Sequence, residues 1–209
     1  MGSSRVVPRN SPLRRRLLGP LPRGRRSPRI AIVALFIAGS VGLALAVYIL
    51  SARVPAATGG QGQAIDGIPC DGGEQTAYHV HAHLAIIDDG QNVLMPAGIG
   101  IVGPWRERYG SIAEAQCYYW LHTHDSSGIV HVEAPSPRQF TLGNLFDIWG
   151  QPLDATVVGP SRGNVMAFVD GRAFSGNVRS IPLVDHAVIV LEVGRTVPPP
   201  SFQFPLYDP

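Results

Sequence analysis

The feature that most constrains this 209-residue chain is an uncharged run near its N-terminus. Residues 30–52, IAIVALFIAGSVGLALAVYILSA, are 23 consecutive residues without a charged side chain. At about 1.5 Å per helical residue, such a run spans the ~30 Å hydrocarbon layer of a bilayer. A cleaved signal peptide is the alternative, but its apolar region is usually only about 7–15 residues long. We therefore expect an uncleaved transmembrane helix over residues 30–52.

The charges on either side of this run predict its orientation. Residues 1–29 contain nine Arg and no acidic residue, which gives a formal charge of +9. Because Arg-rich flanks stay on the cytoplasmic side, these residues are expected to form a cytoplasmic tail. The chain is then a single-pass protein of the cytoplasmic membrane whose C-terminal part is periplasmic or extracellular. The membrane is its expected partner, a membrane-protein partner is compatible with this location, and no small-molecule substrate is indicated.

The exported part has the opposite charge balance. From residue 53 onward there are 8 Arg and 15 Asp and Glu, a formal charge of −7. Nucleic-acid binding has no electrostatic basis in such a domain. We therefore expect no nucleic-acid partner, and we interpret the basic tail as a topology signal.

Composition divides the exported part into three segments. Residues 53–64 are a linker of small residues, and residues 197–209 are too rich in proline for a helix or a central strand. Residues 65–196 are then the folded domain. Short apolar runs between turn residues predict strands at Tyr78–Ile87, Val93–Pro96, Tyr118–Asp125, Ile129–Ala134, Val165–Asp170 and Ala187–Val193.

One helix is predicted among these strands. Apolar residues recur at i, i+3, i+4 and i+7 from Leu142 to Trp149, which is typical of an amphipathic helix. Thr141 is in the position of an N-cap and Gly150 in that of a helix stop. The segment Ser111–Glu114 fits a capping box, but the run is too short to predict a helix. The expected fold class is mainly β: an antiparallel sheet or sandwich with one helix packed on it, after the transmembrane helix.

Two cysteines, Cys70 and Cys117, lie in the folded domain. In an oxidising compartment a disulfide between them is the default expectation. Thiolate ligands to a metal are the alternative, but exported thiols persist poorly unless they are already bound.

Two predicted strands carry histidine on one face and apolar residues on the other. Because side chains alternate along a strand, the run YHVHAHL places His79, His81 and His83 on one face. The next His-rich strand places His122 and His124 together in the same way. Because both strands separate histidines from apolar residues in the same way, we predict that the two histidine faces adjoin in one sheet.

The turn DSSG, residues 125–128, predicts how the second His-rich strand pairs with the strand that follows it. A loop of two or four residues opposes His122 to His131, His124 to Ile129 and Trp120 to Glu133. Opposed Cβ atoms lie about 4.5–5.5 Å apart, so three histidines can converge on one metal ion. A three-residue loop would shift the register by one and place His131 on the wrong face.

The predicted metal site consists of His122, His124 and His131, with the first His-rich strand placed to add His79, His81 or His83. Glu133 is expected on the histidine face. Its role there is that of a fourth ligand, of an acceptor for the ring N–H of a ligand, or of a solvated strand residue. Asp125 is expected to accept backbone N–H groups at the start of the turn, with a ligand or catalytic role as the alternative. The isolated His186 is expected to be a surface residue.

An all-imidazole site suits Zn(II), Cu(II), Fe(II) or Ni(II) and fits Mg or Ca poorly. With both cysteines in a disulfide, copper and zinc are the leading cofactors. The favoured function is transition-metal binding by an exported domain that acts as a carrier, a sensor or a subunit of a membrane complex. A hydrolytic or oxidative enzyme that uses a three-His site is the first alternative. A metal-free extracytoplasmic interaction module is the second.

Four segments in this order give the chain a resemblance to a known group. They are HVHAHL, MPAGIGI (Met95–Ile101), LHTHDSSGIVHVEAP (Leu121–Pro135) and FTLGNLFDIWGQPL (Phe140–Leu153). The chain resembles a group of bacterial membrane-anchored, exported, His-rich hypothetical proteins, over about residues 78–194. The resemblance implies the same location and brings no assigned reaction.

Overall fold

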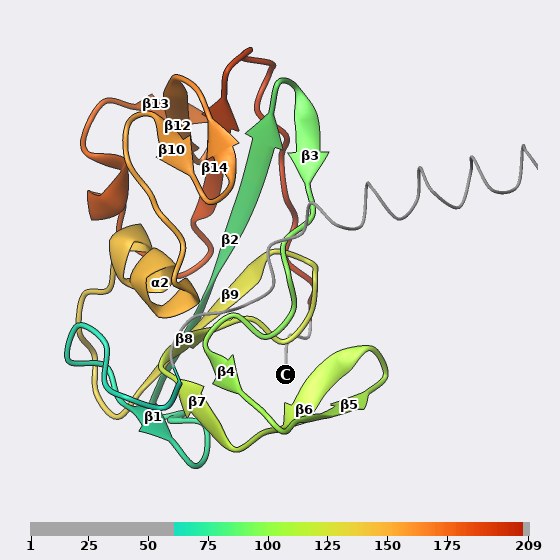
Figure 1. Ribbon diagram of the computed structural model, residues 1–209, viewed down its shortest axis with the longest axis vertical. Helices are drawn as coiled ribbons and strands as arrows, with labels where there is room; N and C mark the ends of the chain where they lie inside the picture. Colours follow the sequence, from blue (N-terminus) through green and yellow to red (C-terminus); the bar gives the residue numbers. More distant parts are fainter. Residues whose placement is uncertain (1–60, 207–209) are drawn as a thin grey trace, which may run out of the picture. The chain divides into compact units, whose positions relative to one another are not determined.

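The computed structural model describes residues 61–206 (Figure 1). The predicted tail and transmembrane helix lie outside this range, and no helix within it is long and apolar enough to span a membrane. The elements are β1 Cys70–Asp71, β2 Tyr78–Asp88, β3 Gln91–Val93, β4 Ile101–Val102, β5 Arg106–Arg108, β6 Ser111–Glu114, β7 Cys117–Tyr119, β8 Leu121–His122, β9 Ile129–Ala134, α2 Leu142–Trp149, β10 Val157–Val158, β11 Ser161–Arg162, β12 Val165–Val169, β13 Arg172–Phe174, η1 Val178–Ser180 and β14 Val188–Val193.

The fold is mainly β with one α-helix in the described residues, as predicted. The largest sheet has the strand order β13-β12-β14-β2-β9-β8, and β3 pairs with β2 beside it. Its long central strand β2 crosses the molecule diagonally in Figure 1. The pairs of this sheet are antiparallel except β14 with β2, which is parallel. The expectation of a purely antiparallel sheet is therefore wrong at this one pair.

Helix α2 packs on one face of this sheet and supplies much of the core. Thr141 is its N-cap and forms a capping box with Asn144, and Gly150 ends it in the left-handed conformation. The apolar side chains of α2 share a buried cluster with Val130 and Val132 of β9. The helix, its cap and its stop are all confirmed, because local spacing and capping determine them.

Two predicted strands differ from the structure, and one capping-box pattern does not mark a helix. Ser111–Glu114, which fits a capping box, is strand β6, because Tyr109 and Gly110 both adopt positive φ and form a two-residue hairpin turn between β5 and β6. Of the predicted strand Val93–Pro96 only Val93 is in a strand, β3. The predicted strand Tyr118–Asp125 is divided into β7 and β8, which belong to different sheets. Its end is not strand, because Thr123 exchanges backbone hydrogen bonds with the loop at residues 98–99.

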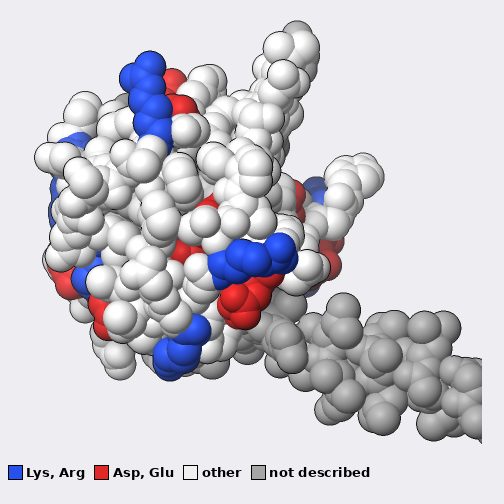
Figure 2. Space-filling view, turned by 90° about the horizontal axis from the view of Figure 1, so that it is seen from above, with Lys and Arg blue, Asp and Glu red and all other residues white. Residues whose placement is uncertain are grey.

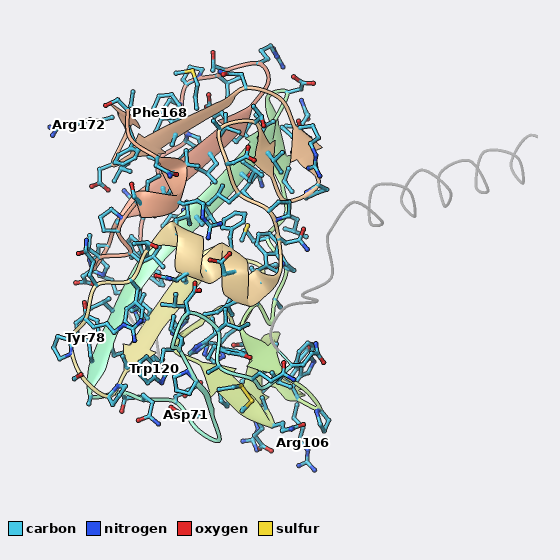
Figure 3. The ribbon with its side chains drawn as sticks, turned by 60° about the vertical axis from the view of Figure 1, so that its left-hand side comes forward. Asp71, Tyr78, Arg106, Trp120, Phe168 and Arg172 are labelled. Carbon is cyan, nitrogen blue, oxygen red and sulfur yellow. A yellow bond between two sulfur atoms is a disulfide. The ribbon has the colours of Figure 1, made fainter. Side chains whose placement is uncertain are left out.

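Cys70 and Cys117 form the predicted disulfide, with their Cα atoms 5.3 Å apart. The bridge joins β1 to β7, which also pair as strands. Beside it, the indole Nε1 of Trp120 donates to Asp71 at 2.8 Å, and both residues are labelled in Figure 3. Trp120 also contacts Phe140 edge-on, so the break between β7 and β8 turns it away from the histidine face where alternation had placed it.

Charged side chains are sparse on the face seen in Figure 2, where acidic groups lie next to basic ones and uncharged surface dominates. On the β5–β6 hairpin, Arg106 and Arg108 form exposed ion pairs with Glu114. Exposed pairs of this kind stabilise a fold little. The core and the disulfide therefore hold the framework on which the histidines are placed.

Candidate metal centre

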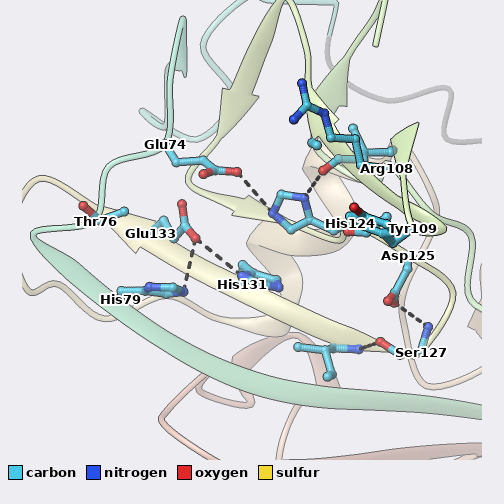
Figure 4. Close-up of a pocket in the computed structure, with 14 residues that line it drawn as sticks. Glu74, Thr76, His79, Arg108, Tyr109, His124, Asp125, Ser127, His131 and Glu133 are labelled. Carbon is cyan, nitrogen blue, oxygen red and sulfur yellow. Dashed lines mark hydrogen bonds and ion pairs between the residues drawn. The ribbon is translucent and has the colours of Figure 1, made fainter. Parts of the chain in front are cut away.

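Three histidines form a row across three adjacent strands. His81 of β2 is opposite His131 of β9, and His131 is in turn opposite His122 of β8. One step along β9, Glu133 is opposite His79. The predicted register of β8 with β9 is confirmed at His122 and His131. All five side chains alternate with core residues and lie on the face of the sheet opposite α2, and Figure 4 shows His79, His131 and Glu133 close together.

Burial differs across this group. His122 is fully buried, and His131 and Glu133 are 5% and 3% exposed, whereas His79 and His124 are half-buried. Burial, together with the neighbouring His131 and His124, lowers the pKa of His122 to about 3. His122 is therefore a neutral imidazole at neutral pH, the form that binds metal ions.

The hydrogen bonds of His122 and His124 fix their tautomers. His122 Nδ1 lies 2.8 Å from the carbonyl oxygen of Tyr119, and His124 Nδ1 lies 2.6 Å from that of Ile112. A carbonyl oxygen only accepts, so each Nδ1 carries the proton. In the neutral rings both Nε2 atoms are then unprotonated, yet they lie 3.1 Å apart. Two lone pairs at this distance need a cation between them.

Close contacts between ring nitrogens continue on the other side of the row. His79 Nε2 lies 2.9 Å from His81 Nε2, and His81 Nε2 lies 3.2 Å from His131 Nδ1. Nitrogens bound to one tetrahedral ion at about 2.0–2.1 Å are about 3.3–3.4 Å apart. The spacing of these rings is therefore close to that of ligands sharing an ion.

Glu133 is a buried carboxylate among these imidazoles. Its Oε1 lies 3.2 Å from His79 Nε2 and 3.4 Å from His131 Nδ1. Burial acts to raise the pKa of Glu133, but the hydrogen bond from His131 and the electrostatic influence of the neighbouring His122, His79 and His131 rings outweigh it and lower the pKa overall. Its Oε2 is buried and has no hydrogen-bond partner among the described residues. A buried anion with an unpaired oxygen is costly unless a cation offsets it.

Glu74 joins the site from the loop between β1 and β2, and sequence analysis missed it. Its Oε1 lies 3.2 Å from His124 Nε2 and 4.0 Å from His122 Nε2 (Figure 4). The residue lies outside every predicted strand and next to two glycines, so no periodicity marks it. The disulfide at Cys70 and the pairing of β1 with β7 hold this loop near the histidine face.

Two groups of side chains in the described part of the chain could hold a metal ion. In each group one ligand atom per residue lies within 4.8 Å of all the others. One group is His122, His124, His131 and Glu133, and the other is His79, His81 and His131. The predicted trio is therefore brought together, and two of the three histidines on the first strand add to it.

Three other candidates lie outside these groups. His83 is buried, approaches the carbonyl oxygen of Ser127 at 3.2 Å and stacks on Phe202 of the C-terminal segment. Asp125 accepts from the backbone N–H of Ser127 at 2.8 Å, which is its expected role in the turn. His186 is exposed, lies 3.8 Å from Asp185 and stacks on Phe204.

A pocket of about 560 Å³ opens onto the site. One wall consists of ligand candidates, including His79, His124, His131 and Glu133, and the β5–β6 hairpin contributes residues such as Tyr109 to the lining (Figure 4). A metal ion held by these residues would therefore border a space large enough for a small molecule.

Comparison of the chain with protein-family models, with curated proteins and with solved structures found no match.

Proposed function

We propose that this protein is a membrane-anchored, exported protein whose β-rich domain binds copper or zinc as a resident ion. The donor set consists of imidazoles and carboxylates, which suit both metals. The disulfide removes sulfur from the choice of ligands. The full burial of His122 favours a fixed site, in a sensor or a subunit of a membrane complex, over a carrier that releases its ion readily.

One observation carries this proposal. In the neutral form His122 and His124 each have one ring N–H, and each donates it to a backbone carbonyl oxygen. The lone pairs of the two Nε2 atoms therefore face each other 3.1 Å apart. Metal-bound histidines are commonly oriented in this way, by a hydrogen bond from the second ring nitrogen to a carbonyl. A proton shared by the two Nε2 atoms would satisfy the same geometry, and only a metal-binding measurement separates the two.

The experiment uses the full-length chain in detergent, without a polyhistidine tag. After stripping with a chelator, Zn(II) and Cu(II) are titrated in competition with a chromophoric chelator. His131→Ala removes a residue common to both ligand groups, and we expect it to weaken binding about 10–100-fold or more. His186→Ala is the matched control and should bind like the wild type. A wild-type chain that takes up no metal would overturn the proposal.

A metal-dependent enzyme is the second candidate, and the pocket of about 560 Å³ is the observation that favours it. A bound ion with an open coordination position would activate water or polarise a substrate there. The discriminating measurement is exchange of the solvent ligand of the Cu(II)-loaded protein with azide. A spectral change on azide addition supports an open position, and its absence supports a closed binding site.

A further inference from the structure

We propose that the site holds two metal ions bridged by the carboxylate of Glu133. This inference rests on the proposed metal-binding function and adds its stoichiometry and its bridging ligand. The first ion would be bound by His79, His81 and His131, and the second by His122, His124 and Glu74. Each oxygen of Glu133 would face one of the two ions.

The first ion's ligands are linked by a chain of close contacts. His81 Nε2 lies 2.9 Å from the Nε2 of His79 and 3.2 Å from His131 Nδ1. Glu133 Oε1 then lies 3.2 Å from His79 and 3.4 Å from His131. Three imidazole nitrogens and one carboxylate oxygen are therefore available on this side, which is the donor number of a four-coordinate Zn or Cu site.

The second ion's ligands adjoin the pocket. His122 Nε2 and His124 Nε2 lie 3.1 Å apart, and Glu74 Oε1 lies 3.2 Å from the latter. Glu133 Oε2 lies 3.9 Å from His122 Nε2. This side therefore offers two nitrogens and two carboxylate oxygens, again four donors.

A single ion cannot use all these donors. Two atoms bound to one ion at about 2.0–2.1 Å are at most about 4.2 Å apart. The pair His79 and His81 and the pair His122 and His124 fall into different groups of mutually close ligand atoms. An ion bound to one group would therefore leave the close pair of ring nitrogens in the other group uncoordinated.

The position of Glu133 and the surroundings of its two carboxylate oxygens suit a bridging ligand. Glu133 is 3% exposed, its Oε1 already contacts the first side, and its Oε2 is buried without a hydrogen-bond partner in the described residues. An ion on the His79 side alone would leave Oε2 buried and unpaired, which is unfavourable for a charged group. A second ion at Oε2 removes this cost.

Stoichiometry tests the proposal on the wild-type chain. The full-length protein is stripped of metal, saturated with Zn(II), separated from free metal by gel filtration and analysed for zinc per chain. Residues 1–60 contain no His, Cys, Asp or Glu, so the N-terminal segment adds no competing side-chain ligands of these types. Two equivalents are expected. One equivalent overturns the two-ion proposal but leaves the proposed function standing, whereas none overturns both.

Paired variants then assign the two ions. His79→Ala with His81→Ala removes two half-buried ligands of the first ion, and His124→Ala with Glu74→Ala removes two accessible ligands of the second. Each double variant should keep one equivalent, and His186→Ala should keep two. Circular dichroism checks that each variant is folded. A folded double variant that still holds two equivalents, or none, contradicts the assignment.

The bridge itself has a magnetic signature. Two Cu(II) ions joined by one carboxylate interact magnetically, so the wild type loaded with Cu(II) should give a broadened spectrum with a half-field transition instead of two isolated Cu(II) signals. Glu133→Gln keeps the side-chain shape but offers a single carbonyl oxygen, so uncoupled Cu(II) signals should appear. Two isolated spins in the loaded wild type would overturn the bridge.

Discussion

His122 and His131 lie directly opposite each other in the β8/β9 ladder, and their rings stack with centroids 5.4 Å apart and planes 11° from parallel. The pairing consists of only two residue pairs, because β8 ends at His122. The whole candidate site therefore depends on the register of a very short hairpin. A shift of one residue would move His131 to the apolar face.

The turn that sets this register should be intolerant of a side chain at Gly128. Its φ is +88°, and a Cβ there would approach the carbonyl oxygen of Leu84 to 2.6 Å. Gly171 is the matched control, with φ +73° and no atom within 4 Å of a Cβ. Gly171→Ala should cost about 1–2 kcal/mol from the left-handed conformation alone. Gly128→Ala should lower the free energy of unfolding in urea by clearly more than Gly171→Ala does, and it should also weaken Zn(II) binding. Equal losses of stability in the two variants would contradict this prediction.

The sequence was sufficient to predict the histidine faces. Alternation in YHVHAHL correctly separated His81 from the apolar Ala82 and Leu84, which are in the core. The turn length correctly opposed His122 to His131. These inferences hold because both follow from the two-residue period of a strand and from turn geometry, which are local properties.

Contacts between distant segments were not predictable in this way. Glu74 reaches His124 only because the disulfide and the small β1-β7-β4 sheet position its loop. His83 shares a face with His81, yet it contacts the turn at Ser127 and the ring of Phe202, a residue from the C-terminal segment. Strand period predicts the face of a side chain but not the loops that cover it.

The disulfide should be a main support of the site. Replacing Cys70 and Cys117 by Ser opens a loop with a sequence separation of 47, for which the chain-entropy model gives a loss of about 4 kcal/mol. The urea midpoint, followed by tryptophan fluorescence, should fall accordingly. Binding of the second zinc should also weaken, because Glu74 lies in the loop after Cys70. Wild-type protein treated with a reductant is the control and should behave like the double variant.

The proposed anchor at residues 30–52 predicts that the purified protein keeps its N-terminus. Sequencing should find the chain starting at Met1 or Gly2, and protease added outside intact bacterial cells or spheroplasts should degrade the C-terminal domain. The physical reason is that a run of 23 uncharged residues behind nine Arg is expected to insert into the membrane with the Arg side in the cytoplasm. A mature chain starting near residue 53 would show instead that the segment is cleaved.

The metal-free domain should lose stability as the pH falls below about 6.5. His122 has a folded pKa of about 3, held down first by burial and then by His131 and His124. An unfolded histidine titrates near 6.5, so between these two values the unfolded chain binds one more proton than the folded one. The unfolding free energy is thus fully retained above pH 6.5 and should fall by about 1.4 kcal/mol per pH unit for His122 as the pH drops toward 3. Urea unfolding at pH 7, 6 and 5 measures this slope, and His122→Gln, which cannot titrate, should remove about that much of it. An unchanged slope in His122→Gln would mean that this buried imidazole already carries a proton in the folded protein.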